Sequence, residues 1–155
     1  MNTLELLKQL IAISSVTGHE ESLACFCEEF LQQHGFKTQR HLMEDQRFNV
    51  LAEKGQGTQA LLLYAHLDTV PPDEQWSMNP FEAQQKGNIL YGLGASDMKA
   101  GLAMLLNVAA SATPENYCLK IALGVDEEGY SKGAWKLISL PWCQNITAVL
   151  VPELG

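Results

Sequence analysis

Residues 60–68 read Ala60-Leu61-Leu62-Leu63-Tyr64-Ala65-His66-Leu67-Asp68. A continuous apolar run bounded by turn residues predicts a buried strand over 60–65. This strand leads into a histidine and an aspartate, two residue types that bind metals. Because side chains alternate along an extended backbone, His66 and Asp68 are expected on the same side of it. The Asp68 carboxylate is then placed to accept the second ring N–H of His66 and so to orient the imidazole.

Two further apolar runs end in carboxylates. Residues 121–125 lead into Asp126-Glu127-Glu128, and residues 146–151 lead into Pro152-Glu153. Ligands of open α/β sheets bind at the carboxyl ends of the strands, so these three strand ends are expected to converge. A histidine and several carboxylates in one place are the groups that a hydrolytic metal site needs.

The rest of the chain alternates between helical and extended patterns. Amphipathic spacing predicts a helix over 3–13, and a capping box, Thr17-x-x-Glu20, predicts a second helix that runs to about His34 and stops at Gly35. The other expected elements are strands over 36–42, 48–53, 118–125 and 146–151, a hairpin over 81–91 around Gly87-Asn88, and helices over 99–112 and 133–140. This alternation predicts an α/β fold with a central mixed, largely parallel sheet flanked by helices.

Composition narrows the class of protein. The 155 residues are 46% hydrophobic and 18% charged, which is typical of a soluble globular domain. A net charge of −8 argues against nucleic acid and anionic membranes as partners. The start of the chain lacks a basic region followed by an apolar one, and the uncharged stretch 100–113 is too short to span a bilayer. We therefore expect a cytoplasmic protein without a membrane segment.

The cysteine pattern agrees with that compartment. The chain contains four cysteines, at Cys25, Cys27, Cys118 and Cys143. Their spacing fits neither a zinc finger nor a disulfide framework, so all four are expected to be reduced thiols.

Each candidate ligand also has an ordinary alternative. His66 and Asp68 can be a polar pair in a loop, and Asp97 can simply cap the apolar helix that follows it. Glu127 and Glu128 can form a solvated acidic turn. Against this, three acids directly after a buried strand are costly without a cation or hydrogen-bond donors nearby. The alternatives also have to hold at every position at once, which favours a shared metal site.

Three motifs, in order and with matching spacing, resemble the M20 family of co-catalytic zinc peptidases and amidohydrolases. They are His66-Leu67-Asp68-Thr69-Val70-Pro71, Tyr91-Gly92-Leu93-Gly94-Ala95-Ser96-Asp97-Met98-Lys99-Ala100-Gly101, and Asp126-Glu127-Glu128-Gly129. Trp76-Ser77-x-x-Pro80-Phe81 fits the segment that usually separates the first two motifs. The resemblance covers nearly the whole chain.

The resemblance implies a set of metal ligands. His66 and Glu153 would bind one zinc, Asp97 would bridge two ions, and Glu128 would bind the second. The implied cofactor is therefore two Zn²⁺ per complete site, with Co²⁺ as a substitute.

The resemblance also implies catalytic roles. Glu127 would be the general base and Asp68 would orient His66, with a cis peptide between Asp97 and Met98. The implied reaction is hydrolysis of an amide bond in an N-acyl amino acid or small peptide. The alternatives are a zinc aminopeptidase and a truncated, non-catalytic binding or assembly module.

Members of the family are longer proteins. Residues 1–155 are therefore expected to be the amino-terminal part of the catalytic domain, without the lid or dimerisation domain and without the carboxy-terminal part that supplies a further histidine ligand. His19, His34 and His41 are expected in surface or capping roles instead. The piece alone is expected to be poorly active and to hold one metal weakly. It is also expected to self-associate through the edge left open near Gly155. A homodimer is expected only of the full-length form.

Overall fold

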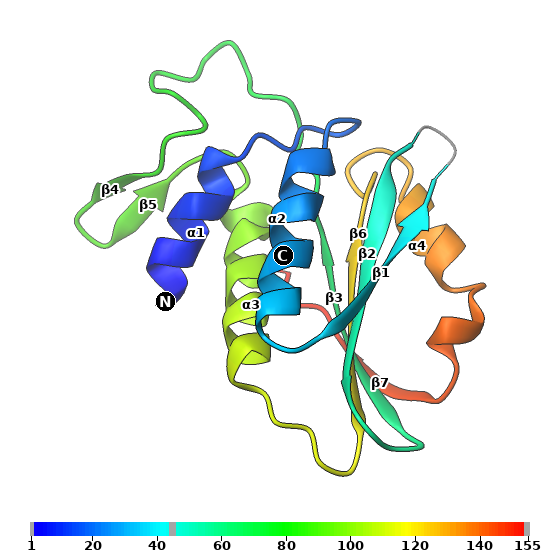
Figure 1. Cartoon of the computed structure of the whole chain (residues 1–155). Coiled ribbons are helices and arrows are strands. Elements are labelled where there is room, and N and C mark those ends of the chain that lie inside the picture. Colours follow the sequence, from blue (N-terminus) through cyan, green and yellow to red (C-terminus); the bar gives the residue numbers. More distant parts are fainter. Residues whose placement is uncertain (1, 44–45, 154–155) are drawn as a thin grey trace.

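A computed structural model of the chain describes residues 2–43 and 46–153 (Figure 1). Its centre is a five-stranded sheet with the strand order β1-β2-β6-β3-β7. The strands are β1 (Lys37–Leu42), β2 (Phe48–Gly55), β3 (Ala60–His66), β6 (Cys118–Gly124) and β7 (Ile146–Leu150). β3 lies between β6 and β7 and is parallel to both. β2 is antiparallel to β1 and to β6, so four strands run in one direction and β2 runs against them, as the prediction of a mixed, largely parallel sheet requires.

Helices cover both faces of the sheet (Figure 1). The helices α1 (Thr3–Ala12), α2 (Glu21–Gln33) and α3 (Ala100–Ser111) lie on one face, and α4 (Lys132–Leu137) lies on the other with the short helix η2 (Pro141–Cys143). The larger apolar core lies under the first three helices. A smaller one, which we call the α4 cluster, consists of Leu51, Leu62, Ala122 and Leu137. The helix predicted over 133–140 is shorter than expected, because α4 ends at Leu137 and η2 follows it.

Two helix ends follow directly from the local sequence. The Asn2 side chain accepts a hydrogen bond from the Glu5 N–H at 2.8 Å and so caps α1. α2 ends at Gln33 and is terminated by Gly35, whose φ of +81° a residue with a side chain rarely adopts. The N–H of Phe36 then turns back to the carbonyl of Leu31 at 3.1 Å. Both ends lie within a residue or two of the predicted positions.

The predicted capping box at the start of α2 is wrong. The helix begins at Glu21, and Glu20 makes no side-chain capping bond. Thr17 Oγ1 instead donates to Asp68 Oδ2 at 2.9 Å, and Glu20 is buried in an ion pair with Arg47 at 3.2 Å. Both side chains form contacts with residues that are distant in sequence, which a local pattern cannot reveal.

The predicted hairpin is present but short. β4 (Gln84–Lys86) and β5 (Ile89–Tyr91) form a separate two-stranded sheet, with Gly87 at its turn at a φ of +61°. Figure 1 shows this hairpin set apart from the central sheet. A kinked turn, η1 (Ala95–Lys99), with non-helical backbone angles at Asp97 and Met98, then leads into α3.

β7 forms one edge of the sheet and carries exposed apolar side chains. Val149 and Leu150 are 57% and 52% exposed. Gly155, near which self-association was expected, lies outside the described residues, so that expectation stays a prediction. No helix within residues 2–43 and 46–153 is long and apolar enough to cross a membrane.

Candidate metal and catalytic site

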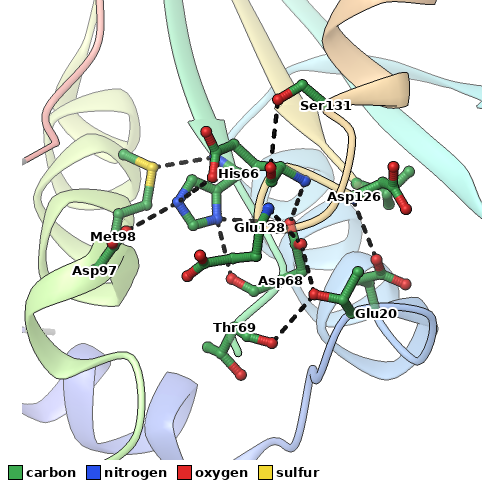
Figure 2. Close-up of polar contacts among 12 residues, drawn as sticks. Glu20, His66, Asp68, Thr69, Asp97, Met98, Asp126, Glu128 and Ser131 are labelled. Atoms are coloured by element: carbon green, nitrogen blue, oxygen red, sulfur yellow. Dashed lines mark hydrogen bonds and ion pairs between the residues drawn. The ribbon is translucent and has the colours of Figure 1, made fainter. Parts of the chain in front are cut away.

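The strand order explains why the predicted ligands meet. β3 lies between β6 and β7 in parallel pairings, so the carboxyl ends of all three strands lie at one edge. Figure 2 shows the His66 imidazole at this edge, with Asp97 and Met98 on one side and Asp68 and Glu128 on the other. The predicted convergence is therefore present in the fold.

His66 is held in place through three of its atoms. Its backbone N–H donates to the Met98 sulfur at 3.1 Å. Its Nδ1 lies 3.0 Å from the Asp68 backbone carbonyl, which only accepts, so Nδ1 carries a proton. Its Nε2 lies 3.0 Å from Asp97 Oδ1 and is the nitrogen left to bind a cation. The imidazole is buried, so these contacts fix its orientation.

Asp68 has a wider role than the one predicted from His-x-Asp. The closest acceptor for His66 Nδ1 is the Asp68 carbonyl, and the carboxylate lies further away at 3.6 Å. The carboxylate is instead bound by the backbone N–H of Glu127 at 2.9 Å and of Glu128 at 3.0 Å, and by the Thr17 hydroxyl. Asp68 thus orients His66 through its carbonyl and anchors the acidic turn through its carboxylate.

Burial alone raises the pKa of the Asp68 carboxyl, but the nearby His66 imidazole and the hydrogen bonds from Glu127, Thr17 and Glu128 outweigh burial and lower the pKa below its ordinary value. Asp68 therefore stays ionised, as an acceptor of several hydrogen bonds must.

Asp97 lies in the η1 turn, and its carboxylate is half exposed. The Asp97–Met98 peptide bond is cis, as the family resemblance implied. Next to it, the buried Lys99 Nζ donates to the carbonyls of Leu10 at 2.9 Å and Ile13 at 2.8 Å. Lys99 thereby ties η1 to the end of α1, a role that sequence reasoning missed.

Glu153 joins His66 and Asp97 in one cluster. Each of the three offers a ligand atom, and these atoms all lie within 4.8 Å of one another. One imidazole nitrogen and two carboxylate oxygens are a donor set that suits Zn²⁺, whose bonds to such atoms are about 2.0–2.2 Å long. Within residues 2–43 and 46–153, this cluster contains three of the four predicted ligands.

Glu128, the fourth predicted ligand, lies beside this cluster rather than in it. It lines a cavity of about 310 Å³ together with Asp97 and the turn around Gly94. Burial and the charge of Asp97 raise the pKa of Glu128 above its ordinary value. Glu128 and Asp97 therefore line the same cavity and influence each other electrostatically.

Glu127, the predicted base, faces the imidazole. Its Oε2 lies 3.9 Å from His66 Nε2, and its side chain is about one-third exposed. A group that takes a proton from water needs both access to solvent and closeness to the reacting centre.

The third acid of this segment, Asp126, turns away from the site. It has a φ of +67°, and its Oδ1 pairs with Arg47 at 3.1 Å. Its Oδ2 accepts the N–H of Tyr130 at 3.2 Å. The buried Asn49 holds the two ends of the same loop, accepting the N–H of Val125 and donating to the carbonyl of Gly133. Asp126 and Asn49 are therefore structural supports for the acidic turn.

The electrostatics of His66 reflect the acids around it. Burial alone lowers the pKa of His66, but Asp68, Asp97 and Glu127 outweigh burial and raise the pKa to about 9. In the absence of a cation the imidazole is therefore positively charged at neutral pH, balancing the carboxylates.

The other histidines do not reach this site. His34 Nδ1 lies 2.7 Å from the carbonyl of Phe30, His41 Nδ1 lies 3.3 Å from the Asn49 side chain, and His19 lines a separate polar pocket. Among the described residues, all three lie outside the cluster of His66, Asp97 and Glu153. The four cysteines are free, as predicted.

Residues 62–153, more than half of the chain, match the model of peptidase family M20/M25/M40. The chain belongs to this peptidase family. Among curated M20 relatives, the acetylornithine deacetylase of Proteus mirabilis is 35% identical over 143 residues, covering 84% of this chain and 37% of the relative. The succinyl-diaminopimelate desuccinylase of Wolinella succinogenes is 32% identical over 149 residues, covering 88% of this chain and 37% of the relative. The chain thus spans little more than a third of the length of these relatives.

Solved M20 structures share the fold. An M20 family metallo-carboxypeptidase from Sulfolobus solfataricus superimposes with a TM-score of 0.85 and 22% identity, covering all of this chain and 38% of that one. Human carnosine dipeptidase 1 gives a TM-score of 0.84 and 20% identity, covering 96% of this chain and 38% of that one. The mixed sheet flanked by helices is therefore the fold of M20 peptidase domains.

Proposed function

We propose that residues 1–155 are the amino-terminal part of the catalytic domain of a metal-dependent hydrolase that cleaves an amide bond in N-acyl amino acids or small peptides. Membership of the M20 family supports this proposal, as do relatives named deacetylase and desuccinylase. The small share of those relatives that the chain spans supports the domain assignment. The observation that carries the proposal is the cluster of His66, Asp97 and Glu153 with Glu127 beside it.

The metal assignment follows from the donor atoms. His66, Asp97 and Glu153 would hold one Zn²⁺, for which Co²⁺ can substitute. Asp97, whose carboxylate is half exposed, and Glu128 would hold a second ion, with the remaining ligand supplied from outside this chain. When bound, the cations polarise the scissile carbonyl and lower the pKa of water.

The chain's own residues divide the remaining work. Glu127 takes the proton of the attacking water and delivers it to the leaving nitrogen, since its carboxylate is partly exposed and faces His66 Nε2. Asp68 holds the backbone N–H groups of Glu127 and Glu128 and thereby places both side chains. His66 is fixed with Nε2 toward the centre by its Nδ1 bond to the Asp68 carbonyl.

The proposal also covers the class of substrate, the cellular compartment and the oligomeric state. The substrate is a small acyl amino acid or peptide rather than a nucleic acid or lipid, in line with a net charge of −8. The free thiols of all four cysteines favour the cytoplasm. Homodimerisation is assigned to the full-length form.

The test measures metal and turnover together. The 155-residue chain, alone and within the longer polypeptide proposed here, is assayed with Zn²⁺ against N-acetyl and N-succinyl amino acids and against dipeptides. We expect zinc binding by both forms, release of the acyl group by the longer form, and little turnover by the chain alone. Cleavage of dipeptides that have a free amino terminus, without cleavage of any N-acylated substrate, would instead favour a zinc aminopeptidase. Zinc binding without any turnover by the longer form would identify a binding or assembly module.

A further inference from the structure

Tyr64 has a buried hydroxyl that packing does not explain. It precedes His66 by two positions in β3, so both side chains emerge on the same face of the sheet. Its ring packs against the α4 cluster. Among the residues that the structure describes, its hydroxyl oxygen has no hydrogen-bond partner although it is buried. Such groups are rare in native proteins and point to a function or to a missing partner.

The ring leans toward the candidate site. In the strand register, Tyr64 pairs with Ala122 and His66 pairs with Gly124. A Cβ atom at position 124 would collide with the Tyr64 hydroxyl and come within 3.1 Å of its Cζ. The hydroxyl therefore extends beyond its own register position, over Gly124 and toward the carboxyl end of β6. Glycine at this position leaves the space that the hydroxyl occupies.

Glu127 lies three residues beyond Gly124 and lacks a donor for its carboxylate. Its backbone is anchored by Asp68, but within the described residues its carboxylate accepts no hydrogen bond. Its Oε2 faces His66 Nε2 at 3.9 Å, which leaves Oε1 available. A general base works best when its carboxylate is held in one orientation.

The other nearby carboxylates fit the Tyr64 hydroxyl less well. Asp68 already accepts hydrogen bonds from Thr17, Glu127 and Glu128. Glu153 follows β7, on the opposite side of β3 from the strand over which the Tyr64 hydroxyl leans. A tyrosine hydroxyl is protonated at neutral pH, so it is available as a hydrogen-bond donor.

We propose that Tyr64 is a positioning residue for Glu127, and that its hydroxyl donates a hydrogen bond to Glu127 Oε1 in the metal-loaded site. Oε2 then remains directed toward the reacting centre. This inference rests on the proposed function, because it takes Glu127 as the general base.

The test is a double-mutant cycle in urea unfolding of the zinc-loaded 155-residue chain, with Tyr64→Phe, Glu127→Ala and both together. Tyr64→Phe is expected to lower the folding equilibrium constant by roughly ten- to a hundredfold, as for a lost hydrogen bond to a charged group. It is expected to have no effect when Glu127→Ala is present. Without zinc, where the hydroxyl has no partner, Tyr64→Phe leaves the constant unchanged or raises it.

Tyr117→Phe, at an exposed tyrosine outside the site, is the matched control. It should leave the folding equilibrium constant unchanged both with and without zinc. An equal effect of Tyr64→Phe with and without Glu127→Ala overturns the proposal, because the hydroxyl then acts on something other than Glu127. Failure of the chain to bind zinc contradicts the proposed function itself.

Steady-state kinetics of the longer hydrolase test the positioning role of Tyr64 separately from the role of Glu127 as the base. Tyr64→Phe is expected to lower kcat about tenfold and to leave KM within about twofold, because the orientation of the Glu127 carboxylate affects the chemical step and not substrate binding. Normal kcat in Tyr64→Phe, with turnover lost in Glu127→Gln, overturns the positioning role and leaves the proposed function in place. Normal turnover in Glu127→Gln removes Glu127 as the base.

Discussion

The carbonyl oxygen of Pro152 lies directly against the α-carbon of Gly101, so any side chain at position 101 would collide with it. Gly101 is the second residue of α3, four residues after Asp97, and Pro152 directly precedes Glu153. This contact sets how closely the segment after β7 approaches α3. It therefore brings the carboxylates of Glu153 and Asp97 together, and glycine is needed for that approach.

Gly101→Ala is expected to weaken zinc binding by the chain at least about tenfold, because the added methyl group pushes Pro152 and hence Glu153 away from His66. Isothermal titration calorimetry measures the effect. Met104→Ala, on the exposed side of the same helix, is the control and should leave the affinity unchanged. Unchanged affinity in Gly101→Ala would show that the approach of Pro152 does not position Glu153.

Asp68→Asn is expected to destabilise the fold by about 1–3 kcal/mol, because an amide nitrogen replaces one of the oxygens that accept the N–H groups of Glu127 and Glu128. Urea unfolding measures the loss. Thr17→Val should cost less, since it removes a single donor to Asp68, and Thr17→Ser should be close to neutral because it keeps the hydroxyl. Equal stability of Asp68→Asn and the unchanged chain would contradict the anchoring role.

Zinc binding is expected to release close to one proton per ion at pH 7. The pKa of His66 is raised to about 9 without metal, and a metal ligand must lose the proton on Nε2. Zinc affinity should therefore fall as the pH falls below about 9. The pH dependence of the stability of the metal-free chain has the opposite sign. The protonated imidazole stabilises the fold fully below its ordinary pKa of 6.5, and this contribution is lost as the pH rises through about 9.

Calorimetry in buffers with different ionisation enthalpies measures this proton release. His34, at the end of α2, provides the control: His34→Gln should release the same number of protons as the unchanged chain. Zinc binding with no proton release at pH 7 would mean that His66 is neutral before the metal arrives.

Glu127→Gln is expected to bind zinc within about threefold of the unchanged chain, because Glu127 is outside the ligand cluster. In the longer hydrolase the same substitution should lower kcat by at least about a hundredfold, as for loss of a general base. Steady-state kinetics with an N-acyl amino acid measure this. A parallel loss of zinc from the variant would make Glu127 a ligand instead.

The parts of the fold that were predictable depend on local pattern. The apolar run of β3 and its continuation into His66 and Asp68 placed the site at a strand end, because a buried parallel strand needs apolar residues on both faces. The helix end at Gly35 was predictable for the same kind of reason, since its backbone conformation excludes most other residues.

The parts that sequence reasoning missed depend on contacts between distant residues. Thr17 was assigned to a capping box, but its hydroxyl bonds to Asp68, 51 residues away. Gly101 was recognised only as the last residue of the second motif, and a motif does not show that this glycine determines the position of Pro152. Tyr64 looked like one more apolar strand residue. Its hydroxyl, in an otherwise hydrocarbon run, was the one available signal that it does more than pack.

The central claim is that His66, Asp97 and Glu153 hold one cation together. Crystals of the chain soaked in Zn²⁺ and measured at the zinc absorption edge test it most directly. The account predicts an anomalous peak bonded to His66 Nε2 and to one oxygen from each carboxylate, at about 2.0–2.2 Å. A peak elsewhere on the chain, with these three side chains still hydrogen-bonded only to protein, would contradict it.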